Sequence, residues 1–162
     1  MAQEIERKFL VVGEYKNLAH TSMHLVQGYI ASGSRTVRVR ISDDMAWLTI
    51  KGPSADGGLS RFEWEHEIPA KEAMELLHLA EGALIDKRRY LVDFEGHTFE
   101  VDEFYGDNEG LVIAEVELGS IDEAVVYPYW IGKEVTGIKR YYNSQLRSHP
   151  YRLWDADEKD MK

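Results

Sequence analysis

The sequence contains no cysteine, which excludes a disulfide framework, a thiolate metal site and a cysteine nucleophile. No apolar run approaches the roughly 20 residues that a membrane-spanning helix needs, so no membrane partner is expected. The six histidines show neither HxH nor HExxH spacing, and we predict none of them as a metal ligand. The lack of cysteine fits a reducing cytosol, and the strand-like N-terminal pattern is not that of a secretory leader. We therefore predict a cytoplasmic protein.

Positive charge is also scarce. The 19 Lys and Arg residues face 29 Asp and Glu residues, which gives a formal net charge of -10. Affinity for a nucleic-acid duplex comes mostly from neutralisation of phosphates, so nucleic acid is not an expected partner. If the protein binds a smaller polyanion, its basic residues must be gathered at one place.

What the sequence has in abundance is charged residues at alternate positions of predicted strands. Glu4, Glu6 and Lys8 alternate with Ile5 and other residues in the first strand. Similar i, i+2 pairs recur at Arg38/Arg40, Glu63/Glu65, Lys87/Arg89, Glu100/Asp102 and Glu115/Glu117. Because successive side chains of a strand point to opposite sides, each of these strands has one ionised face.

The pattern predicts a mainly β (α+β) fold with a few covering helices. Strands are expected at 4–12, 24–31, 35–42, 45–51, 59–68, 84–94, 97–104 and 110–118, joined mostly by hairpin turns. Helices are expected from Pro69 to Gly82, over 120–126 from a Ser120/Glu123 capping box, and over 139–148. Eight hairpin-linked strands have a natural solution without free edges, an eight-stranded antiparallel closed β-barrel.

The length of 162 residues fits one domain, which we place at 1–150, followed by an acidic and frayed tail at 151–162. The charged faces of the barrel have two alternatives. If they point outward, the barrel has an ordinary apolar interior. If they point inward, the barrel is a charged tunnel whose apolar outer faces need helices or a partner, which is compatible with a homodimer.

An inward orientation would have a definite chemistry. Clustered carboxylates bind hard divalent cations such as Mg²⁺ or Mn²⁺ through oxygen. Clustered Arg and Lys side chains bind phosphate. A site with both suits a metal–polyphosphate complex, and phosphoryl transfer needs mainly positioning and electrostatic stabilisation.

The ordered set of charged pairs resembles the CYTH superfamily, the triphosphate tunnel metalloenzymes. Glu4-Ile5-Glu6-Arg7-Lys8 matches its ExExK signature, and the later segments resemble its RxR, TxK, RxExE, KxRY, ExE and EVT…RYxN elements in the same order. These are Arg38-Val39-Arg40, Thr49-Ile50-Lys51, Arg61 with Glu63 and Glu65, Lys87 to Tyr90, Glu115-Val116-Glu117, and Glu134 to Asn143. The resemblance spans residues 4 to about 146. Within the superfamily, the chain resembles small bacterial inorganic tripolyphosphatases.

The resemblance implies a tunnel-shaped barrel that hydrolyses triphosphates with Mg²⁺ or Mn²⁺. It implies phosphate contacts from Lys8, Arg38, Arg40, Lys51, Arg61, Lys87, Arg89 and Arg140. It implies metal binding by Glu4, Glu6, Glu115 and Glu117, with Glu63, Glu65 and Asp102 as further candidates. Relatives often carry Asp where this chain has Ile138, which puts a metal role of the C-terminal element in doubt.

Two catalytic candidates come from the same resemblance. Tyr29 resembles a tyrosine that lies near the lysine corresponding to Lys87. A lysine desolvated among other cations has a lowered pKa, so Lys87 could help to activate water. The alternative is that Lys87 only holds phosphate.

Three functions are therefore weighed. The first is metal-dependent hydrolysis of a small-molecule triphosphate, inorganic tripolyphosphate above all, with release of orthophosphate. The second is a class IV adenylate cyclase that forms cyclic AMP from ATP, although no motif identifies a purine pocket. The third is a non-catalytic polyphosphate- or nucleotide-binding module, which would need chiefly the cations and not the acids.

Overall fold

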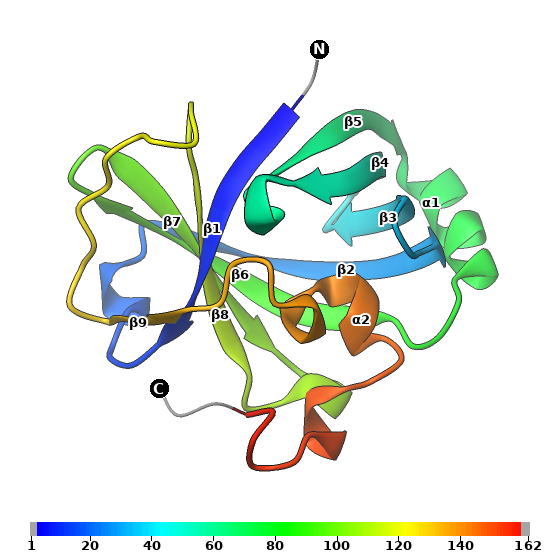
Figure 1. Cartoon of the computed structure of the whole chain (residues 1–162). Coiled ribbons are helices and arrows are strands. Elements are labelled where there is room, and N and C mark those ends of the chain that lie inside the picture. The colour runs from blue at the N-terminus through cyan, green and yellow to red at the C-terminus, as the bar shows by residue number, and fades with distance from the viewer. Residues whose placement is uncertain (1–2, 160–162) are drawn as a thin grey trace.

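A computed structural model describes residues 3–159, and its strands form a closed antiparallel ring (Figure 1). The strands are β1 (Gln3–Val11), β2 (Thr21–Ala31), β3 (Thr36–Ser42), β4 (Met45–Ala55), β5 (Ser60–Pro69), β6 (Ile85–Phe94), β7 (His97–Phe104), β8 (Val112–Glu117) and β9 (Ile131–Glu134). The ring runs β5–β4–β3–β2–β6–β7–β8–β1 and closes through pairing of β5 with β1. The predicted eight-stranded antiparallel closed β-barrel is confirmed.

Short turns join most neighbouring strands, as the sequence indicates. Residues 43–44 join β3 to β4, and residues 95–96 join β6 to β7. Asp43 and Glu95 have φ angles of 55° and 47°, the left-handed conformation that tight hairpins require. Two further connections contain a short 3₁₀ helix. η2 (Asp56–Gly58) lies between β4 and β5, and η4 (Gly106–Asn108) lies between β7 and β8.

Strand β1 has three partners. β8 pairs with one edge, and β5 and β9 pair with different residues of the other edge. Glu4 pairs with Arg61 of β5, whereas Phe9 pairs with Glu134 of β9. Between them, the backbone N–H of Glu6 donates to Leu59 and that of Val135 donates to Lys8. The two segments meet at Gly58 and Gly137, where an added Cβ on Gly58 would lie 2.4 Å from the Cα of Gly137. We call this contact the glycine seam.

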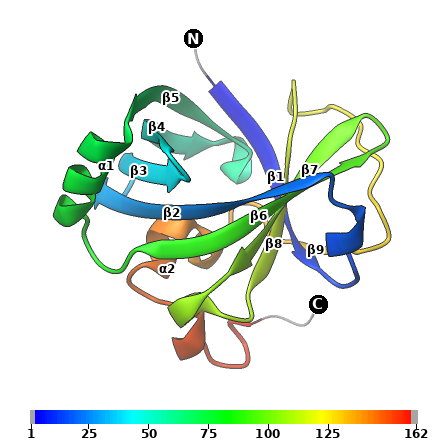
Figure 2. The same ribbon diagram turned by 180° about the vertical axis from the view of Figure 1, so that it is seen from behind.

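The outer face of β3 and β4 is covered by a helix. α1 (Ala70–Leu76) begins directly after Pro69 and continues as η3 (Leu77–Leu79), so the predicted helix exists but is shorter than expected (Figure 2). Its Ala73 is fully buried against Val39 and Ala46. Val39 and Ala46 alternate with the charged positions of their strands, so this apolar cluster lies outside the barrel.

A second apolar cluster covers the outer face of β1, β7 and β8. Phe99, Val101 and Val116 pack there against Trp130 and the segment that precedes it. The predicted helix over 120–126 is wrong, because this segment forms only turns before running extended to Pro128. The backbone N–H of Glu123 donates to Ser120, so the capping pattern closes one turn and the β-branched residues that follow do not propagate it.

A third apolar cluster lies inside the barrel and fills one end of it. Each of its strand residues lies two positions from an inward charged residue and so shares its face; they are Leu10, Ile85, Phe104 and Ile113. They pack against Tyr141, Leu146 and Trp154 from the C-terminal segment. This segment contains η5 (Lys139–Tyr141), α2 (Asn143–Leu146) and η6 (Tyr151–Leu153), so the helix predicted over 139–148 is divided in two. We call this cluster the plug.

The C-terminal residues contribute to the plug. Trp154 is 5% exposed, and its indole Nε1 donates to the carbonyl of His149 over 3.0 Å. The division into a domain at 1–150 and a tail at 151–162 stays a prediction, and residues 160–162 of the tail lie outside the described residues. The remaining 3₁₀ helix is η1 (Lys16–Leu18), and in the range 3–159 no helix has the length and apolarity to cross a membrane.

Candidate functional site

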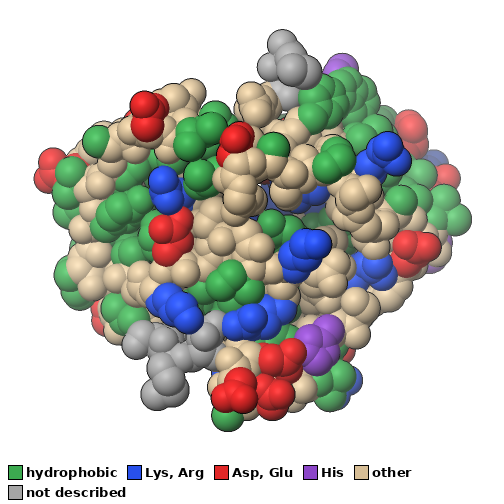
Figure 3. All heavy atoms as spheres, viewed as in Figure 1, with side chains coloured by type: hydrophobic (Ala, Val, Ile, Leu, Met, Phe, Trp, Pro, Cys, Tyr) green, Lys and Arg blue, Asp and Glu red, His purple; other side chains and the backbone are tan. Residues whose placement is uncertain are grey.

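The charged faces of the strands point inward and enclose a cavity of about 200 Å³. The space-filling view, seen from the same side as Figure 1, shows a hollow near the centre of the surface, with Lys and Arg side chains beside it (Figure 3). The inward alternative of the sequence analysis therefore holds. The plug fills the barrel at one end of the cavity.

Most of the predicted site residues meet in this cavity. They are Glu4, Glu6, Lys8, Tyr29, Arg38, Arg40, Lys51, Arg61, Glu63, Glu65, Arg89, Glu115 and Glu117. The structure does not bring Lys87, Asp102 or Arg140 into the lining of the cavity. The Nε of Arg140 instead donates to the carbonyl of Glu158 over 2.8 Å, and its guanidinium lies over the Tyr141 and Trp154 rings of the plug.

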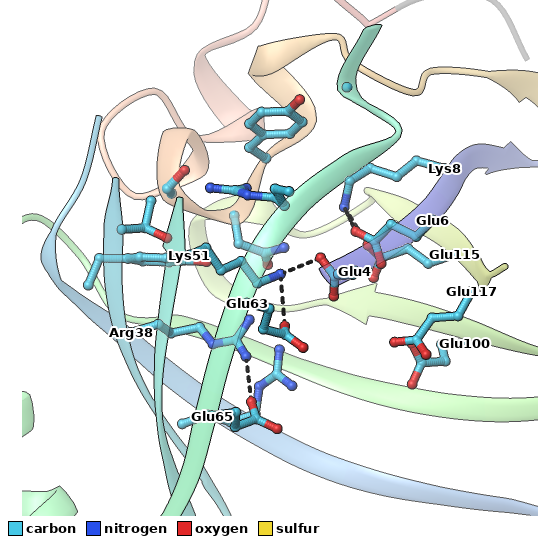
Figure 4. A pocket seen from close by; sticks show the side chains of 18 of the residues that line it. Glu4, Glu6, Lys8, Arg38, Lys51, Glu63, Glu65, Glu100, Glu115 and Glu117 are labelled. Atoms are coloured by element: carbon cyan, nitrogen blue, oxygen red, sulfur yellow. Dashed lines mark hydrogen bonds and ion pairs between the residues drawn. The ribbon is translucent and has the colours of Figure 1, made fainter. Parts of the chain in front are cut away.

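Acidic and basic side chains lie mostly on different sides of the cavity, because most strands carry one sign on their inward face. β5 is an exception, since Glu63 and Glu65 follow Arg61 and lie beside Lys51 and Arg38. Figure 4 shows Glu6, Glu115, Glu117 and Glu100 on one side of the cavity and Arg38 and Lys51 on the other. We call Glu4, Glu6, Glu100, Glu115 and Glu117 the acidic wall; they come from β1, β7 and β8. We call Arg38, Arg40, Lys51 and Arg61 the basic wall; they come from β3, β4 and β5.

Ion pairs form both between the two walls and within each side of the cavity. The Nζ of Lys51 lies 2.8 Å from a Glu4 oxygen and 3.5 Å from Glu63. Lys8 donates to Glu115, and the guanidinium of Arg38 lies 3.3 Å from Glu65. These pairs reduce the cost of burying charge, which would otherwise be several kcal/mol per ion.

The acidic wall holds more negative charge than its neighbours neutralise. Burial, together with the adjacent Glu115, raises the pKa of Glu6 to about 8. Burial also raises the pKa of Glu100, and burial with the nearby Glu100 and Glu4 raises that of Glu117. For Glu115, Lys8 and Arg89 outweigh burial and hold the pKa well below its usual range. An added cation at this wall would relieve the crowding.

Carboxylate oxygens of this kind suit a hard divalent cation. The donors that could hold it are Glu4, Glu6, Glu115 and Glu117, all on adjacent paired strands. Across the part of the chain that the structure describes, no three carboxylate or imidazole groups surround one point closely enough to hold a metal alone. That fits a cation such as Mg²⁺, which commonly uses one or two carboxylates together with water and substrate phosphates.

The basic wall holds a corresponding excess of positive charge. Burial, followed by the charges of Arg38 and Arg89, lowers the pKa of Arg40 to about 9. The buried Nε of Arg38 has no hydrogen-bond partner among residues 3–159. Crowded guanidinium groups with unused donors suit an anion with several oxygens, such as a phosphate chain.

Lys87 lies one layer below the cavity, next to the plug. It is fully buried, and its Nζ donates to Asp102 over 2.6 Å and to Asn143 over 3.3 Å. Asp102 also accepts two hydrogen bonds from Arg89, of 2.8 and 2.9 Å. Burial lowers the pKa of Lys87 to about 7 against the opposing charge of Asp102, and Arg89 and Arg40 lower it further.

Tyr29 lines the cavity but is not joined to Lys87 by a hydrogen bond in the described structure. Its hydroxyl accepts from the Nε2 of Gln27 over 3.4 Å. Ile138, where relatives often carry Asp, is partly buried against the plug. It therefore has a packing role in this chain.

Several lining residues escape the sequence prediction of the site. Glu100 pairs with Glu115 across β7 and β8; the sequence placed it with Asp102 on one ionised strand face but assigned it no role in the site. Tyr142, Asn143 and Ser144 reach the cavity from the C-terminal segment, as does Thr36 from the start of β3. Uncharged residues in a loop or short helix carry no periodic signal that distinguishes them from packing residues.

Comparisons with known proteins agree with this geometry. A family model described as the CYTH domain matches residues 2–145. An inorganic triphosphatase of Acetivibrio thermocellus is 51% identical over 155 residues, covering 94% of this chain and 97% of that protein. An inorganic triphosphatase of Nitrosomonas europaea is 36% identical over 148 residues, covering 88% of this chain and 95% of that protein. The crystal structure of the inorganic triphosphatase NE1496 is similar with a TM-score of 0.65 and 34% identity, covering 91% of this chain and 95% of that one.

Proposed function

This chain belongs to the CYTH domain family, and from that premise we propose that it is a metal-dependent enzyme that hydrolyses inorganic tripolyphosphate. It is a triphosphatase that cleaves a phosphoanhydride bond with water and releases orthophosphate. The observation that carries the proposal is the enclosed cavity in which an acidic wall faces a basic wall.

The size and lining of the cavity favour an inorganic substrate. Pockets for drug-sized ligands occupy about 300–1,000 Å³ and are mostly apolar. This cavity is about 200 Å³ and is lined mainly by charged side chains, which suits a short phosphate chain better than a nucleotide. No observation favours a cyclase, which would need a place for adenine.

In the proposed reaction, the basic wall binds and orients the phosphate chain. Arg38, Arg40, Lys51 and Arg61 contact phosphate oxygens from one side, and Lys8 and Arg89 contact them from the other strands of the ring. Glu4, Glu6, Glu115 and Glu117 of the acidic wall would hold a divalent cation, which would supply positive charge against the charge that develops on the phosphate chain. Because the water and the phosphorus are held close together, the walls lower the barrier chiefly by positioning and electrostatics.

Lys87 is proposed as a positioning residue that acts through Asp102. Its ammonium group has no exposed surface, and Asp102 links it to Arg89, which does line the cavity. An attacking water in the cavity would contact Arg89 before Lys87. The catalytic role predicted for Tyr29 stays a prediction, and so do the phosphate contact of Arg140 and a metal contact of Asp102.

One assay tests the function. Purified protein with Mg²⁺ or Mn²⁺ is offered tripolyphosphate, ATP and thiamine triphosphate, and the products are resolved. We expect orthophosphate from tripolyphosphate, with Glu6→Ala inactive and Arg40→Ala impaired in substrate capture. The exposed Glu109→Ala in a turn is the control. Cyclic AMP from ATP, or tight binding without turnover of any substrate, would refute the proposal.

The association state is a separate proposal. Ile50, Phe62 and Trp64 are 39%, 42% and 38% exposed. They alternate with the inward charged positions of β4 and β5, so they lie on the outer faces of these strands. We propose a homodimer through this apolar face, to be checked by analytical ultracentrifugation of the wild type against Trp64→Glu. A monomeric wild type would rule it out. The predicted cytoplasmic location stays a prediction.

A further inference from the structure

Gln27 is a buried amide inside the barrel that the reaction outlined above does not use. It lies on β2 directly opposite Arg40 of β3 and is fully buried. The Nε of Arg40 donates to the Gln27 Oε1 over 2.8 Å, and the Gln27 Nε2 donates to the Tyr29 hydroxyl over 3.4 Å. Because a guanidinium can only donate, the amide oxygen must face Arg40 and the amide nitrogen must face Tyr29.

The neutral partner makes Arg40 different from the cations around it. Lys8, Arg38, Lys51, Lys87 and Arg89 each have a carboxylate within ion-pairing distance. Arg40 forms no ion pair within the described part of the chain, although it lines the cavity and is partly buried. The only hydrogen bond of its guanidinium among residues 3–159 is the one from Nε to Gln27.

This arrangement separates orientation from neutralisation. The hydrogen bond to Gln27 fixes one edge of the guanidinium, so that less freedom is lost when an anion binds. The amide carries no net charge, so the positive charge of Arg40 is not cancelled before the anion arrives. The two terminal nitrogens are left for a bidentate contact, the geometry in which arginine binds phosphate best.

The charges of the surrounding side chains agree with a positive charge on Arg40 that no ion pair neutralises. Burial, followed by the charges of Arg38 and Arg89, lowers the pKa of Arg40 to about 9, and the opposing charge of Asp102 does not outweigh them. A carboxylate at position 27 would remove that crowding and would occupy the place of the incoming anion in the charge balance.

We propose that Gln27 is a positioning residue that aims Arg40 at a phosphate group of the substrate while leaving its charge uncompensated. The proposal rests on the triphosphate-binding function proposed above. It makes a specific claim about residue type, because Glu at this position would keep the hydrogen bond to Arg40 but cancel its charge. Glu is therefore expected to be worse than an apolar side chain of the same size.

The test measures binding of tripolyphosphate by calorimetry in EDTA, together with KM and kcat with Mg²⁺. For Gln27→Glu we expect Kd and KM to rise about tenfold or more, as for loss of one charge-assisted hydrogen bond. For Gln27→Met we expect a smaller rise, and Asn17→Asp, which makes the same charge change on exposed η1, is the matched control. In an Arg40→Gln background, the Gln27 variants should have little further effect.

Each outcome decides between the claims. A Gln27→Glu protein that folds and binds tripolyphosphate as tightly as Gln27→Met overturns the proposal, and so does an undiminished effect in the Arg40→Gln background. If Gln27→Glu does not fold, the cycle of Gln27→Met with Arg40→Gln still decides, because additive losses would show that the two residues act independently. A wild type that does not bind tripolyphosphate would refute the function itself.

Discussion

At the scale of single residues, depth within the barrel decides what a charged side chain can do. Arg89 and Lys87 are neighbours on the same face of β6, yet only Arg89 lines the cavity. Lys87 lies level with the plug residue Phe104, its partner in the strand register. A strand pattern shows that two residues share a face, but the stagger of the strands decides how far along the barrel each one lies.

Lys87 leads to a prediction about stability and pH. Its pKa is lowered from 10.5 to about 7 in the folded protein, so between these values the unfolded chain binds a proton that the folded chain does not. The free energy of unfolding contributed by this group therefore rises with pH across that window. Urea denaturation at pH 8, 9 and 10 should show a wild-type free energy that increases relative to Lys87→Met.

The exposed Lys71→Met on α1 controls for the loss of a lysine charge. A constant difference between wild type and Lys87→Met across the three pH values would contradict a lowered pKa. It would mean that Asp102 keeps Lys87 protonated over the whole range.

The same scale shows how far the sequence could predict the site. The residue types and their order identified most of the lining, because charged residues at alternate positions of strands are visible in the sequence. The choice between inward and outward charges was not decidable from alternation, since both faces have the same period. Gln27 was not predicted as part of the site, because an isolated amide carries no pattern. Asn143 was recognised as the last residue of the C-terminal element of the family resemblance, but no role was assigned to it.

At the scale of elements, local signals placed the eight strands of the ring but not the ninth. Their boundaries agree with the expected ranges to within a few residues, except that β2 begins earlier and β4 ends later. β9 spans only Ile131–Glu134 and pairs with β1 alone, so it depends on a contact distant in sequence. The false helix over 120–126 has the opposite cause, a correct local cap followed by residues that pack as an extended segment.

The glycine seam gives a prediction for two adjacent turn residues. Gly57 and Gly58 both have positive φ angles, 68° and 95°, but a Cβ on Gly57 meets nothing within 4 Å while one on Gly58 meets the Gly137 backbone. Gly57→Ala should cost roughly 1–2 kcal/mol for its backbone conformation. Gly58→Ala should cost about 1–3 kcal/mol more, because backbone must also move. Urea denaturation of both variants measures the difference.

The Tyr142 hydroxyl lies 3.3 Å from the same Cβ position of Gly58 and its side chain lines the cavity. The seam therefore connects the wall of the barrel to the site. Equal losses of stability for Gly57→Ala and Gly58→Ala would show that the two segments separate without cost.

At the scale of the whole molecule, the barrel has two kinds of interior. Charged residues fill one part of the lumen and the apolar plug fills the other, while two further apolar clusters lie outside the ring. The hydrophobic stabilisation that a conventional barrel gains from its centre must here come largely from covering segments. The C-terminal segment is therefore structural as well as part of the site.

Trp154 tests this dependence. It packs in the plug with its ring centroid 5.1 Å from that of Tyr141, whereas its neighbour Leu153 is 54% exposed. Trp154→Ala should lower the free energy of unfolding by about 3–5 kcal/mol. Leu153→Ala should change it by about 0.5 kcal/mol or less, as for other surface substitutions. Similar values for the two variants would mean that the last turns fray and contribute nothing.

The threefold pairing of β1 has a consequence for synthesis. This strand is translated before all others, yet Glu4 must wait for Arg61, Lys8 for Glu115 and Phe9 for Glu134. A nascent chain therefore carries part of the β1 edge unpaired until β8 and then β9 have been translated. Ribosome stalling or premature termination upstream of Ile131 would release a polypeptide with an open strand edge, a ready substrate for chaperones or for aggregation.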